Sequence, residues 1–190
     1  MLPIEEALSA AGGLLEVDGE HIAIIVVGGA TLNLLGVVHR STRDVDVIAR
    51  AHRGPDGEFS LARAEPFPES LQRAIRTVAR DLGLPANWMN GEVGAQWSQG
   101  LPPRILEGIT WRVYGGLEVG LVSRHTLIAL KLFAAVDGGT GSVHVQDLLA
   151  LAPTDGELHE AAEWVATQDA HEGFTAMISR VIEHVQRRRS

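Results

Sequence analysis

Residues 22–29 read IAIIVVGG and residues 44–48 read DVDVI, and these two stretches carry most of the information about the fold. The first begins as a continuous apolar run rich in β-branched side chains, which is typical of a strand buried on both faces. Gly28-Gly29 interrupts this run, and the good helix formers of residues 30–35 predict a short helix after it. The second stretch predicts another apolar strand, so the sequence indicates a strand–helix–strand unit.

Two acidic side chains open the second predicted strand. Side chains at positions i and i+2 of a strand point to the same face, so we expect the carboxylates of Asp44 and Asp46 to lie side by side. Such a pair suits Mg²⁺ or Mn²⁺, which take further ligands from water and substrate phosphates. The Gly28-Gly29 turn would let the backbone approach those phosphates. Taken separately, each signal has a simpler interpretation: a tight turn for the glycines and a solvated edge for the acids.

The rest of the chain predicts helices around a small mixed sheet. We expect strands at 109–114 and 117–122, joined as a hairpin, and an irregular connection over 51–68. Apolar periodicity predicts helices at 3–15 (ended by Gly12-Gly13), 70–82, 124–136, 146–151 and 157–186, the last broken near Gly173. The expected fold class is α+β, with a core at 1–151 and a C-terminal helical extension at 152–190 packed on it.

Composition sets limits on location and partners. The 190 residues carry a formal net charge of −8, which argues against a protein that binds nucleic acid through a generally basic surface. Arg40, Arg43, Arg50 and Arg53 nevertheless cluster around the acidic motif and predict a local anion-facing end. The absence of cysteine and of any long apolar run predicts a cytoplasmic protein without membrane contact.

Lys131 is the only lysine of the chain, and it lies in an otherwise apolar predicted helix. It either holds an anion, whether a phosphate or the carboxylate of Asp147, or extends from a core-facing helix to solvent. Asp147 itself either takes part in such a pair or caps the N-terminus of its helix. Arg40 and Arg43 either clamp phosphates or balance the two aspartates.

The order of these residues resembles the GG…G…R-x-T-x-D-x-D pattern of DNA polymerase beta-like nucleotidyltransferases. The likeness is strongest to a small bacterial group that includes AbiE-type abortive-infection toxins and mycobacterial tRNA nucleotidyltransferase toxins. The matching residues are Gly28, Gly29, Ala30, Gly36, Arg40, Thr42, Asp44 and Asp46, followed by Lys131 and Asp147 in the matching order.

The resemblance implies a nucleotidyltransferase fold and a role for each matched residue. Asp44 and Asp46 would bind the metal, and with Lys131 and Asp147 they would form the catalytic set. The nucleotide would lie against Gly28, Gly29, Arg40, Ser41 and Thr42. A third carboxylate is common in the family, and Glu118 is the best candidate for it here.

The expected function is metal-dependent transfer of a nucleoside monophosphate from an NTP to an acceptor hydroxyl. The resemblance implies an RNA acceptor, the 3′ end of tRNA, a toxin role and a cognate antitoxin that acts through an inhibitory phosphate on Ser41 or Thr42. The alternatives are transfer to a small molecule, as in aminoglycoside nucleotidyltransferases, transfer to a protein, and a degenerate module that binds nucleotide without catalysis. The acidic net charge suits a cationic small acceptor better than RNA.

Overall fold

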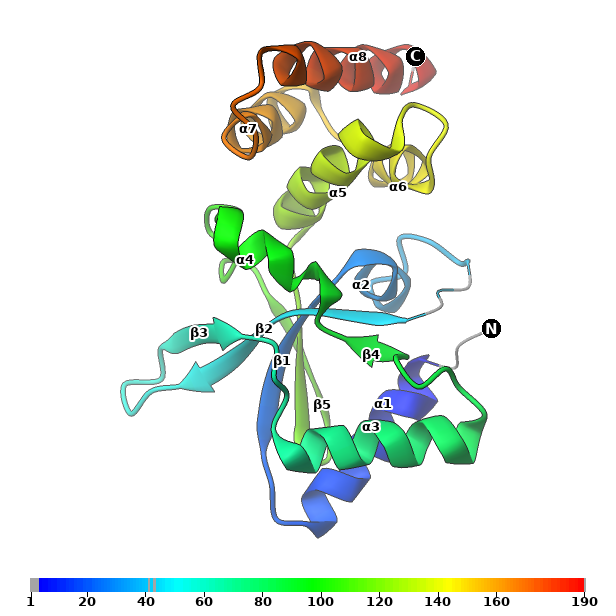
Figure 1. Ribbon diagram of the computed structural model, residues 1–190, viewed down its shortest axis with the longest axis vertical. Coiled ribbons are helices and arrows are strands. Elements are labelled where there is room, and N and C mark those ends of the chain that lie inside the picture. The colour runs from blue at the N-terminus through cyan, green and yellow to red at the C-terminus, as the bar shows by residue number, and fades with distance from the viewer. Residues whose placement is uncertain (1–3, 41, 43, 190) are drawn as a thin grey trace. The chain divides into compact units, whose positions relative to one another are not determined.

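The computed structural model describes residues 4–40, 42 and 44–189 and has an α+β fold (Figure 1). Contacts divide the chain into two units, one of Met1–Ser98 with Leu106–Val122 and the other of Gln99–Ile105 with Ser123–Ser190. This division differs from the predicted one at residue 151, because α5 (Arg124–Gly138) and α6 (Val143–Leu151) group with the later helices.

The first unit contains one mixed sheet with the strand order β3-β2-β1-β6-β5. β1 is parallel to β6 and antiparallel to β2, while the short β4 pairs in parallel with the start of β2. The predicted hairpin is confirmed as the antiparallel pair β5–β6. The strands are β1 (Ile22–Val27), β2 (Val45–Arg53), β3 (Phe59–Arg63), β4 (Met89–Asn90), β5 (Thr110–Tyr114) and β6 (Leu117–Leu121).

Two helices, α1 (Ile4–Val17) and α3 (Glu69–Leu82), contact each other and cover one face of this sheet, hereafter the first face (Figure 1). Val26 and Val47 pair across β1 and β2 and lie in this core. Asp46 pairs with Val27 and therefore lies on the opposite, second face. Val26 pairs with Val47 and Ile25 pairs with Ala49, so the β1–β2 ladder skips Ile48, which forms a β-bulge in β2.

The predicted end of the first helix at Gly12-Gly13 is wrong, because α1 continues to Val17. A Cβ at Gly12 would overlap the backbone carbonyl of Tyr114, and the amide of Gly116 donates to the carbonyl of Gly12 at 2.9 Å. This glycine therefore serves a close approach of α1 to the β5–β6 hairpin rather than a helix end.

The predicted irregular connection over residues 51–68 is also wrong in part. β2 runs on to Arg53 and pairs with β3, whose side chains are mostly half-buried or exposed. A half-buried strand is recognised by strict alternation of apolar and polar residues, and in β3 the adjacent Leu61 and Ala62 break this alternation. The expected irregularity of residues 87–103 is closer to the structure, which has only β4, η1 (Glu92–Ala95) and α4 (Gln96–Gln99) there.

The second unit is helical, with α5 packed against α6, α7 (Asp155–Ala166) and α8 (Glu172–Arg189). The predicted long C-terminal helix is interrupted between α7 and α8, just before Gly173. Over the described residues, no helix is both long and apolar enough to cross a bilayer.

Candidate functional site

The turn between β1 and α2 (Gly28–Leu34) is the centre of the candidate site in the first unit. Gly28 has φ +74°, a value that side chains disfavour, and it allows the buried strand to turn directly into the helix. Inside the turn the hydroxyl of Thr31 donates to the carbonyl of Val26 at 2.7 Å. The helix thus begins two residues earlier than predicted, at the first glycine of the pair.

Asp46 lies directly against this turn. It is the register partner of Val27, and its Oδ2 atom lies 2.5 Å from the position that a Cβ on Gly28 would occupy. The carboxylate therefore fills the space that any side chain at position 28 would need. Asp44, two residues earlier and partly buried, directly precedes β2.

The loop before β2 folds back over the second glycine. A Cβ on Gly29 would lie 3.1 Å from the hydroxyl oxygen of Thr42, and this hydroxyl donates to the carbonyl of Asp44 at 3.1 Å. The loop is also tied to α2, because the Asn33 amide donates to the carbonyl of Arg40 at 2.9 Å. The structure therefore places Gly29 and Thr42 together beside the Gly28–Asp46 contact. Ser41 and Arg43 lie outside the described residues.

The predicted cluster of arginines divides between different surroundings. Arg40 is exposed, and its carbonyl accepts from Asn33 near the end of α2. Arg50 donates from Nε to the carbonyl of Arg63 at 3.0 Å. Arg53 lies over the ring of Phe59, 4.5 Å from its centroid, and pairs with Glu118 at 3.8 Å. Arg50 and Arg53 are thus engaged by β3 and β6, away from the turn.

Glu118 does not lie with Asp46. It is the register partner of Ala23, four residues before Val27 along β1. At about 3.3 Å per residue this separates the two levels by roughly 13 Å. Among the described residues, no group of three or more His, Asp or Glu side chains is arranged to hold a metal ion.

Lys131 and Asp147 form a buried ion pair in the second unit, with Nζ to Oδ2 at 2.8 Å and side chains 8% and 1% exposed. Lys131 therefore does not extend to solvent. Asp147 does not cap its helix either, because the N-cap of α6 is Ser142, whose hydroxyl accepts from the amide of Val145. Of the interpretations considered for these residues, the structure shows the lysine–carboxylate pair.

Asp44 and Asp46 supply oxygen ligands of the type that a magnesium ion takes. Mg²⁺ is usually held by one or two carboxylates, with water and substrate phosphates supplying the other ligands. Asp44 and Asp46 offer two carboxylates at i and i+2, and Gly28 leaves the adjoining space to the Asp46 carboxylate rather than to a side chain of its own.

Comparison with protein-family models, with curated proteins and with solved structures gave no match in any of the three. The site thus rests on its own geometry. Sequence reasoning missed Asn33, which holds the loop, and Arg112 on β5, whose contacts with α2 are described below. Neither residue has a local sequence signal, because its partner lies in another element.

Proposed function

We propose that this chain is a metal-dependent nucleotidyltransferase that moves a nucleoside monophosphate from an NTP to an acceptor hydroxyl. The observation that carries the proposal is the contact between Gly28 and the Asp46 carboxylate, with Thr42 over Gly29 beside it. A side-chain-free turn against the Asp46 carboxylate, with Asp44 two residues before it, joins a place for phosphate to a place for a divalent cation.

In this proposal Asp44 and Asp46 hold the ion, and the Gly28-Gly29 backbone leaves room for the triphosphate. The acceptor oxygen attacks the α-phosphorus in line, and a new P–O bond forms as the bond to the β-phosphate bridging oxygen breaks. Pyrophosphate leaves, and the hydroxyl proton passes to a nearby carboxylate or to water. A bound divalent cation would supply positive charge to the phosphates and lower the pKa of the acceptor hydroxyl.

The 3′ end of tRNA is the first acceptor to test, on the strength of the resemblance to tRNA-modifying toxins. A small cationic molecule is the second, because Arg50 and Arg53 are engaged elsewhere and the chain carries a net charge of −8. A protein hydroxyl is the third. Growth arrest and a cognate antitoxin belong to the first case only.

The test incubates the purified chain with each α-³²P-labelled NTP and Mg²⁺, together with total tRNA, an aminoglycoside or a cell extract. The variants Asp44→Asn and Asp46→Asn are compared with Asp81→Asn, an exposed carboxylate on α3 that pairs with Arg80. We expect label on one acceptor class with the wild type and with Asp81→Asn, and its loss with either site variant or with EDTA.

Label on tRNA would support the toxin-like transferase, and label on the aminoglycoside or on protein would assign the acceptor to that class. The proposal fails if no acceptor is labelled and no pyrophosphate is released. In that event, Mg²⁺-dependent NTP binding lost in Asp46→Asn would identify a nucleotide-binding module without catalysis.

A further inference from the structure

The helix that carries Gly28 and Gly29 is too short to hold itself in place. α2 has only seven residues, and isolated helices shorter than about 12–15 residues are marginal in water. Its position must therefore come from anchors outside its own backbone bonds. At its beginning the Thr31 hydroxyl bonds the carbonyl of Val26, and near its end Asn33 bonds the carbonyl of Arg40.

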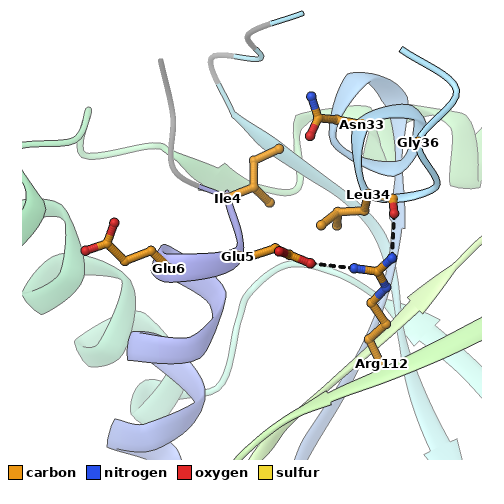
Figure 2. Close-up of a pocket in the computed structure, with 7 residues that line it drawn as sticks. All are labelled: Ile4, Glu5, Glu6, Asn33, Leu34, Gly36 and Arg112. Atoms are coloured by element: carbon orange, nitrogen blue, oxygen red, sulfur yellow. Dashed lines mark hydrogen bonds and ion pairs between the residues drawn. The ribbon is translucent and has the colours of Figure 1, made fainter. Parts of the chain in front are cut away.

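A third anchor reaches the end of α2 from a distant strand. Arg112 on β5 donates from Nη2 to the carbonyl of Leu34 at 2.5 Å and from Nη1 to Oε1 of Glu5 at 2.6 Å (Figure 2). The last carbonyls of a helix lack partners within it and form the negative end of its dipole, so a guanidinium is a favourable partner. Charge-assisted bonds of this kind are stronger than neutral ones.

The surroundings of this contact combine packing with open space. A hollow of about 450 Å³ lies beside the guanidinium, with Asn33, Gly36 and Ile4 among its lining residues (Figure 2). Leu34 also lines the hollow, but its side chain is buried in the apolar core, so packing and the two bonds together hold the end of α2. Glu6 also lines the hollow, but its side chain points away from Arg112 in Figure 2.

The anchored end and the Gly28 turn belong to the same continuous helix. Six helical steps separate Leu34 from Gly28, which is about 9 Å at about 1.5 Å per residue. Asn33, next to Leu34, holds the loop that carries Thr42. Movement at the end of α2 would therefore shift both the Gly28–Asp46 contact and the position of Thr42 over Gly29.

We propose that Arg112 is a positioning residue for the Gly28–Asp46 site, which it stabilises through the Leu34 carbonyl with Glu5 as its second partner. The link to NTP rests on the function proposed above. The anchoring of α2 by Arg112 does not rest on that function, so an experiment can test the anchoring and the function separately.

The test compares Arg112→Met, which keeps the aliphatic part of the side chain but removes both bonds, with Arg112→Lys and the matched control Glu6→Gln. Hydrogen exchange is measured by mass spectrometry on peptides covering 28–40 and, as an internal reference, 70–82. Arg112→Met should raise exchange in 28–40 at least about tenfold, which is the lower end of the effect of losing a hydrogen bond to a charged group, with 70–82 unchanged. Arg112→Lys should fall between Arg112→Met and wild type, and Glu6→Gln should match wild type.

A kinetic measurement with Mg·NTP completes the design. Arg112→Met should raise the KM for NTP more than it lowers kcat, because the reacting groups remain while their support is loosened. Unchanged exchange in 28–40, or an equal rise in both peptides, would overturn the anchoring. If the wild-type chain transfers no nucleotide, the proposed function fails, and the exchange measurement still decides the role of Arg112.

Discussion

Gly28 and Gly36 stand at the two ends of α2 with almost the same backbone conformation, φ +74° and +72°. Their surroundings differ. A Cβ on Gly28 would lie 2.5 Å from the Asp46 carboxylate, whereas a Cβ on Gly36 would have nothing within 4 Å. Alanine substitutions at these two glycines therefore separate the stability cost of a left-handed backbone from the stability cost of displacing the Asp46 carboxylate.

Gly36→Ala should lower the free energy of unfolding by about 1 kcal/mol, from backbone strain alone. Gly28→Ala should cost about 2–4 kcal/mol, because the new methyl group must also displace the Asp46 side chain. Urea unfolding measures both. The double variant Gly28→Ala with Asp46→Ala should recover part of the excess, and equal losses for the two single variants would contradict the contact.

For single residues, the sequence predicted those that belong to short motifs with a recognisable spacing. Asp44-x-Asp46 and Gly28-Gly29 follow simple spacing rules, and the structure brings Gly28, Gly29, Thr42 and Asp46 together. Arg112 could not be predicted in the same way, because its contact with Leu34 joins residues 78 positions apart.

Between elements, the Lys131–Asp147 pair joins α5 to α6 inside the second unit. Removing one partner of a buried ion pair leaves the other charged and unpaired, which costs about 3–5 kcal/mol. Lys131→Met should therefore destabilise the chain by this amount in urea unfolding. Lys131→Met with Asp147→Leu should regain most of it, since a well-packed apolar pair often replaces a buried ion pair without loss. A double variant no more stable than Lys131→Met would contradict this account.

A second contact between elements depends on pH. Hydrogen bonds from Gln186 and Arg189 of α8 lower the pKa of Asp155 at the start of α7 below its ordinary value of 3.8. A depressed carboxyl pKa favours the folded state at pH above the unfolded value, and this contribution is lost as pH falls through the folded value. An NMR titration should place Asp155 below 3.8 and show an upward shift in Gln186→Ala. An unchanged pKa in that variant would show that Gln186 does not stabilise the carboxylate.

Helices and strands could be predicted where burial gives the sequence a clear apolar pattern. The apolar run of β1 and the amphipathic α3 were both placed to within a residue of their observed bounds. Glycine misled the prediction where it served packing, as at Gly12 in α1. A glycine that ends a helix and one that permits a close approach look identical in sequence, because the deciding partner, here Tyr114, lies elsewhere.

For the whole molecule, the division into two units was the feature hardest to predict from the sequence. β6 ends at Leu121 and α5 begins at Arg124, and this short junction has no linker-like composition. The chain also returns to the first unit at Leu106 after contributing Gln99–Ile105 to the second. A boundary made by packing rather than by a flexible segment leaves no compositional trace.

The bulge at Ile48 has a consequence for how this chain can change over evolutionary time. Because Ile48 is the residue that the β1–β2 ladder skips, its loss would leave Val47 on the first face and Ala49 on the second. Loss of Val47 or Ala49 would keep the two faces as well, because Ile48 would take the vacated position in the ladder. Shortening β2 by one residue between Val47 and Ala49 therefore removes the bulge, while the carboxylate of Asp46 keeps its side of the sheet.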